Sequence, residues 1–90
     1  MSISRRVLIA NKRGLHARAS AKFVQMVERF NAEVFVTRGN ETVGGTSIMG
    51  LMMLGAGIGS SITVAVTGAE AKQCLDALDT LVSSKFGEEE

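Results

Sequence analysis

His16 is the only histidine of the 90-residue chain, and it lies in the segment NKRGLHARAS, two residues before Arg18. The residues after it have helical spacing, so we expect His16 near the N-terminus of a helix. A first helical turn leaves backbone N–H groups unpaired and is electropositive, which favours an anion on or beside the imidazole. The guanidinium of Arg18 matches phosphate oxygens. The pair predicts an imidazole nucleophile that carries an anionic group.

The residue types disfavour a hydrolytic site, a disulfide framework and a metal site. No acid, cysteine or second histidine stands near His16 in the sequence to complete a hydrolytic triad, so a self-contained hydrolase is disfavoured. One cysteine, Cys74, excludes an internal disulfide framework and a multi-cysteine zinc site, and we expect no metal and no cofactor. Cys74 falls in an apolar helical stripe, where a buried, inert thiol is expected. The alternative for His16 is an ordinary surface or cap histidine.

Charge is balanced overall but uneven along the chain. Residues 1–27 contain six basic side chains and no acid, whereas residues 70–90 contain six acids and two lysines. A basic N-terminal segment suits an anionic ligand or an acidic protein partner, although the charges could simply be solvated. Nucleic acid is disfavoured because only Phe23 supplies an aromatic ring among the basic residues.

The elements that must position these residues follow from periodicity and turn signals. A strand is predicted over 5–10, an amphipathic helix over 17–30, a hairpin of strands over 32–37 and 42–43, a short helix over 48–54 capped by Thr46-Ser47, a strand over 61–67, and a helix over 70–86 followed by an acidic tail of Glu88, Glu89 and Glu90. Glycines 55, 57 and 59 form a connector after the short helix, without the Lys-Ser/Thr ending of a nucleotide loop.

The order β-α-β-β-α-β-α predicts a two-layer α+β sandwich, a single domain spanning residues 1–90, because strands with one apolar face need helices to cover it. Periodicity alone leaves the strand order undetermined. No apolar run approaches the roughly 20 residues of a membrane span, and nothing resembles a signal peptide. We therefore expect a small soluble protein of a reducing, cytoplasmic compartment, without membrane insertion.

Two motifs carry a resemblance to a known family. GLHARASAKFV, followed some thirty residues later by GTSIMGLMMLGAG, resembles the histidine-containing phosphocarrier protein (HPr) family of the bacterial phosphotransferase system, over essentially the whole chain. The resemblance implies an open-faced sandwich with a four-stranded antiparallel sheet of order 1-4-2-3 and three helices on one face. It also implies that His16 is phosphorylated on Nδ1 by phospho-enzyme I and passes the group to an enzyme IIA domain. Arg18 would contact the phosphate and the partner.

The resemblance implies further roles and leaves some questions open. Ser47 matches a regulatory phosphorylation position, so an HPr serine kinase/phosphorylase is a further candidate partner, but Ser47 could also be a plain helix cap. The family usually has proline where this chain has Ala19, which weakens the motif and removes neither chemical group. The chain would be a relay component rather than a stand-alone catalyst, and a monomer. Sugar uptake and a regulatory, nitrogen-related branch remain alternatives.

The short helix is the expected docking surface. Six of the seven residues in IMGLMML are apolar, and a helix on a sheet buries only about half of its circumference. If Leu51 and Leu54 face the core, then Ile48, Met49 and Met52 are partly exposed, as suits a surface that must fit several partners. The alternative is that the methionines fill the core. A non-catalytic regulator of the same fold could dispense with His16, so its presence favours the carrier.

Overall fold

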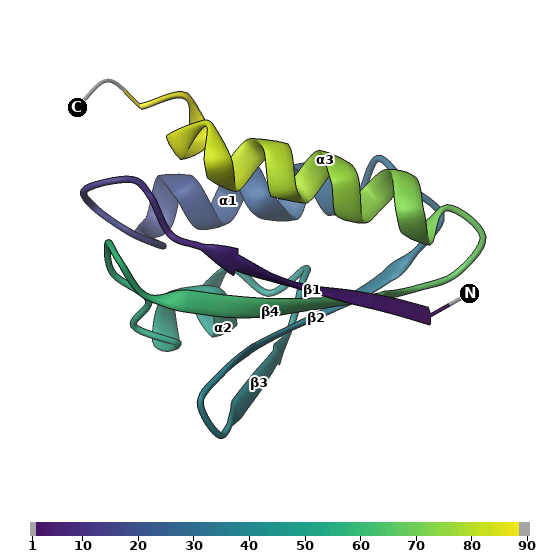
Figure 1. The fold of residues 1–90 in the computed structure, drawn as a ribbon, viewed down its shortest axis with the longest axis horizontal. Helices are drawn as coiled ribbons and strands as arrows, with labels where there is room; N and C mark the ends of the chain where they lie inside the picture. The colour runs from purple at the N-terminus through teal and green to yellow at the C-terminus, as the bar shows by residue number, and fades with distance from the viewer. Residues whose placement is uncertain (1, 89–90) are drawn as a thin grey trace.

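The structure, a computed structural model, describes residues 2–88, and one four-stranded antiparallel sheet organises them (Figure 1). The spatial order is β1-β4-β2-β3, which confirms the predicted open-faced sandwich. Glu89 and Glu90 of the predicted acidic tail lie outside the described residues. The elements are β1 (Ser2–Leu8), α1 (Ala17–Val27), β2 (Glu33–Arg38), β3 (Glu41–Gly44), α2 (Ile48–Met53), β4 (Ser61–Thr67), α3 (Ala71–Ser83) and a short 3-10 turn, η1 (Lys85–Gly87).

The core lies between the sheet and the helices. Alternate residues of each central strand point toward α1 and α3, which lie side by side over one face (Figure 1). On β4 the inward residues are Ile62, Val64 and Val66, each at most 1% exposed, as the alternation predicted. Leu51 of helix α2 and Leu54, directly after it, add to the same core. Leu8 and Phe35 are on the outward face of the sheet and are exposed.

Several predicted element ends were wrong, each for a local reason. Strand β1 begins at Ser2 rather than Arg5, because Ser2–Ser4 pair with Thr67–Ala65 of β4. Helix α1 ends at Val27 rather than Phe30, because the amide of Phe30 donates to the Val27 carbonyl three residues back, as in a tighter turn. The predicted helix over 70–86 ends at Ser83, because Lys85 and Phe86 have φ of 61° and 55°. Phe86 nevertheless reaches the core, which is why its apolar spacing looked helical.

One close approach of two loops determines where α1 begins. The amide of Leu15 donates to the Ala56 carbonyl (3.0 Å), which joins the β1–α1 loop to the α2–β4 loop. Gly14 precedes this bond with φ +64°, and a Cβ there would lie 2.4 Å from the Ala56 oxygen. Only glycine therefore lets the two backbones meet at this point.

Within residues 2–88, none of the helices has the length and apolar character needed to cross a bilayer.

Gly14→Ala is expected to lower the free energy of unfolding by more than about 2 kcal/mol, because it adds a backbone clash to left-handed strain. Gly39→Ala is the matched control, since Gly39 also has a positive φ (+60°) but has open space around its Cβ position. Gly39→Ala should lower the free energy of unfolding by about 1 kcal/mol. Urea unfolding of both variants measures the difference, and equal losses would show that the loop contact does not constrain the fold.

Candidate functional site

His16 is the N-cap residue of α1, in extended backbone conformation (φ −71°, ψ 177°). Its carbonyl accepts the first helical bond from the Ser20 amide at 2.9 Å, so the amides of the three residues before Ser20 are not used by the helix ladder. The imidazole makes no capping bond of its own, and the first turn of α1 contains no acid. The positive end of α1 is thus left for a negative group from elsewhere in the chain.

The acid that reaches the His16 ring is Glu88, which the sequence interpretation did not single out as a site residue. Glu88 Oε2 lies in hydrogen-bond contact with His16 Nε2, and Asn11 Nδ2 donates to Glu88 Oε1 at 3.1 Å. The side chains of His16 and Glu88 are only 18% and 15% exposed. The hydrogen bond with His16 is the main cause that lowers the pKa of Glu88, and Asn11 and the charge of Arg13 act in the same direction against partial desolvation. The sequence showed only an acid in a tail 72 residues from His16.

Asn11 fixes this arrangement from the β1–α1 loop. It is fully buried, and its Nδ2 also donates to the Gly14 carbonyl at 2.8 Å. Its Oδ1 is buried with no partner among the described atoms. The amide therefore uses its donors on the loop and on Glu88, and the loop, the first turn of α1 and the segment after α3 form one hydrogen-bonded unit.

Arg18 lies exposed in the first turn of α1, as predicted, and within residues 2–88 it makes no hydrogen bond or ion pair. The other basic residues of the N-terminal segment differ in their surroundings. Arg5 pairs with Asp76 at 3.1 Å and Asp79 at 2.9 Å on α3, and these contacts raise the pKa of Arg5. Lys22 donates to the Phe86 carbonyl at 2.7 Å. Part of the basic segment is thus bonded inside the fold, while Arg18, two residues after His16 in the first turn of α1, is exposed.

The predicted docking residues lie on the surface of α2. Ile48, Met49 and Met52 are 42%, 72% and 43% exposed, whereas Leu51 is fully buried, so the methionines do not fill the core. Met52 and His16 line one shallow depression of about 290 Å³, together with Arg13, Leu15 and residues 55–57. Met53 and Ile58, which the sequence interpretation did not single out, extend the exposed apolar surface.

Ser47 is the N-cap of α2, as predicted. Its backbone is extended and its Oγ accepts from the Gly50 amide at 2.9 Å. Cys74 is buried in the core, and burial raises the pKa of its thiol. Among residues 2–88 there is no cluster of three histidine, cysteine or acidic side chains that could hold a metal.

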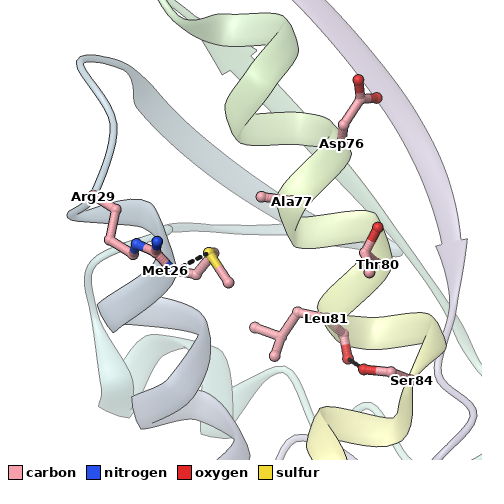
Figure 2. Close-up of a pocket in the computed structure, with 7 residues that line it drawn as sticks. All are labelled: Met26, Arg29, Asp76, Ala77, Thr80, Leu81 and Ser84. Atoms are coloured by element: carbon pink, nitrogen blue, oxygen red, sulfur yellow. Dashed lines mark hydrogen bonds between the residues drawn. The ribbon is translucent and has the colours of Figure 1, made fainter.

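A larger groove, of about 490 Å³, lies between α1 and α3 and has different chemistry (Figure 2). Figure 2 shows Met26 on α1 and Arg29 in the turn after it, facing Leu81 on α3, with Arg29 Nη1 donating to Met26 Sδ at 3.8 Å. No nucleophile such as imidazole or thiol lines it. The depression that His16 shares with Met52 is therefore the candidate functional site.

Comparison with known proteins gives full-length similarities. The phosphocarrier protein HPr of Cupriavidus necator is 46% identical over 98% of this chain and 99% of its own length. The phosphocarrier protein NPr of Shewanella violacea is 41% identical, over 96% of this chain and 94% of its own.

Solved structures agree with the fold. The crystal structure of HPr-C-His from Thermoanaerobacter tengcongensis aligns with a TM-score of 0.92 at 39% identity, over 98% of this chain and 99% of that one. A crystal structure of an HPr dimer from the same organism aligns with a TM-score of 0.76 at 40% identity, over 91% and 94% of the two chains. The family model described as "PTS HPr component phosphorylation site" matches residues 3–84. With this match and these relatives, the chain belongs to the HPr family of the phosphotransferase system.

Proposed function

We propose that this chain is a phosphocarrier that accepts a phosphoryl group on His16 from phospho-enzyme I and passes it to an enzyme IIA domain. The family membership supports the carrier role, since its relatives are named phosphocarrier proteins. The observation that carries the assignment to His16 is its place at the N-cap of α1, where the first turn contains no acid and Arg18 is exposed beside it. A doubly negative phosphoryl group on this ring would meet unpaired amides and a guanidinium.

The chemistry needs few groups from this chain. A phosphoryl group on an imidazole nitrogen transfers readily when it is held in line and its charge is stabilised. The chain supplies the ring, the helix end and Arg18, and the partner's own active site supplies the rest. The protein is then a reactant in a relay rather than a stand-alone catalyst.

The exposed α2 residues support docking beside the reacting ring. Met52 shares the depression with His16, and Ile48 and Met49 continue the apolar surface along α2. Flexible methionine side chains can fit more than one partner, as a carrier between enzyme I and enzyme IIA requires. Arg13 and Arg18 add positive charge near the ring, so an acidic partner surface fits best.

Relatives of both names, HPr and NPr, match at comparable identity, so the sugar-uptake and nitrogen-related branches are both compatible with this chain. We propose a cytoplasmic monomer, and we propose that it is a single domain because one hydrophobic core joins the sheet and the helices. A dimeric relative is known, and the oligomeric state can be measured directly by light scattering.

His16→Ala is expected to abolish phosphoryl acceptance. In a reaction with enzyme I and labelled phosphoenolpyruvate, the wild-type protein should gain one acid-labile, base-stable phosphate, and the variant none. Circular dichroism of the variant controls for folding, because the Glu88 contact is lost with the ring. Full labelling of a folded His16→Ala protein contradicts the assignment.

Arg18→Ala is expected to slow phosphoryl transfer at least about tenfold, because a charge-assisted contact worth roughly 1.5–3 kcal/mol is lost. Thermal stability should change little, since Arg18 is exposed and makes no described contact. Arg6→Ala is the control, because Arg6 is exposed on the outward face of β1. If both variants transfer at the wild-type rate, Arg18 is only a solvated charge.

We also propose that Ser47 is a regulatory site, modified by an HPr serine kinase/phosphorylase. Its hydroxyl is already directed at the Gly50 amide, so a phosphate there could keep that bond and be stabilised by the first turn of α2. The same phosphate would add about −1.5 to −2 charges beside Ile48 and Met49 and repel an acidic partner.

Ser47→Asp is expected to raise the KM for phosphorylation by enzyme I more than it lowers kcat, and the rise should shrink at high salt because screening weakens the repulsion. Ser4→Asp, which adds the same charge on exposed strand β1, should leave KM unchanged. Steady-state kinetics at two salt concentrations measure both variants. Identical kinetics for wild type and Ser47→Asp at low salt would leave Ser47 as a helix cap only.

A further inference from the structure

The segment that follows α3 turns back toward His16 through three left-handed residues. Lys85, Phe86 and Gly87 have φ of 61°, 55° and 76°, a conformation that side-chain-bearing residues rarely adopt. Two contacts hold it in place: the Phe86 ring is 1% exposed in the core, and the Phe86 carbonyl accepts from Lys22 Nζ of α1 at 2.7 Å. These contacts keep the segment in a strained backbone conformation that places Glu88 beside the β1–α1 loop.

At the end of this path the two carboxylate oxygens of Glu88 have separate partners. Oε1 accepts from buried Asn11, and Oε2 contacts His16 Nε2. The charge of Arg13 also acts on the carboxylate, and together these groups lower the pKa of Glu88, so that it is ionised at neutral pH. An ionised carboxylate only accepts hydrogen bonds. The proton of the neutral His16 ring therefore stands on Nε2, and Nδ1 keeps its free electron pair.

We propose that Glu88 is a positioning residue for phosphoryl transfer, which holds His16 with Nδ1 free to attack and stabilises the positive charge that the ring acquires. This inference rests on the proposed function of His16. In the step, the Nδ1 electron pair forms the bond to phosphorus, and the bond between phosphorus and the donor's leaving atom breaks with its electrons left on the donor. Nε2 keeps its proton, so the phosphorylated ring is a cation beside the Glu88 carboxylate. Onward transfer returns the electron pair to Nδ1.

The geometry favours positioning over competition. A carboxylate that competed with the phosphoryl group would occupy the place beside the reacting nitrogen. Glu88 instead engages Nε2, and the bond from Asn11 keeps it on that edge of the ring. A carboxylate in this relation to an imidazole fixes its tautomer and stabilises the imidazolium that forms during reaction.

The test uses the full chain with Glu88→Gln, which keeps the size and removes the charge, and Glu28→Gln as the control. Glu28 is exposed at the opposite end of α1. In the unphosphorylated protein, ¹⁵N NMR of the His16 ring should show a predominant Nε2–H tautomer for wild type and for Glu28→Gln. In Glu88→Gln the two nitrogens should move toward the averaged shifts of a tautomer mixture, which a merely structural role would not produce in a folded protein.

Single-turnover transfer from phospho-enzyme I gives the second readout. Glu88→Gln should accept the phosphoryl group roughly tenfold more slowly, since a charge-assisted bond is about twice as strong as a neutral one. Glu28→Gln should match wild type. Wild-type tautomer and rate in Glu88→Gln, or faster acceptance, would overturn this inference and leave the proposed function standing. A wild-type protein without phosphate on His16 would overturn the proposed function, and this inference with it.

Discussion

The meeting of the β1–α1 and α2–β4 loops is the constraint on which the site depends. Leu15 donates to the Ala56 carbonyl, and Gly14 is the residue without a Cβ that allows the approach. Because α1 begins directly after this contact, the loop pair determines both the position of His16 and its distance along the surface from α2. The depression that contains His16 and Met52 is formed by residues from both loops. His16 and Met52, 36 residues apart in sequence, thus become neighbours through backbone contacts that need no side chain.

The N-terminus of α1 has no acid in its first turn, so its positive charge must be balanced by a group from outside the helix. In the structure Glu88, which comes from beyond α3, contacts His16 Nε2 and accepts a hydrogen bond from Asn11. In the carrier state we propose that the phosphoryl group occupies the amide-rich side, while Glu88 faces the other ring nitrogen. One ring nitrogen then contacts the Glu88 carboxylate and the other carries the phosphoryl group. The orientation of the ring is thus fixed before a partner binds.

Local patterns predicted most of the fold, and they failed where contacts are distant. Alternation predicted β4 from Ser61 to Thr67 and its inward face, because a strand covered on one side leaves a period of two in the sequence. The apolar spacing that ends at Phe86 predicted a continuous helix, since periodicity records burial and not backbone conformation. His16, Arg18, Ser47 and the α2 surface could be singled out from residue type and motif. Glu88 could not, because its contact with His16 depends on left-handed conformations of Lys85 and Phe86, which these residue types do not favour.

The distribution of charge shows why a protein of net charge +1 can still present a positive site. Arg5, on the inward face of β1, forms ion pairs with Asp76 and Asp79 of α3, and Lys22 donates a hydrogen bond to the Phe86 carbonyl. The Arg5 pairs tie the sheet to α3 through two acids of the second half of the chain, and the Lys22 bond ties α1 to the segment after α3. Arg18 is left exposed beside the ring. Since exposed charges steer encounter more than they add affinity, a carrier that must release each partner gains from an exposed cation such as Arg18 near an apolar patch.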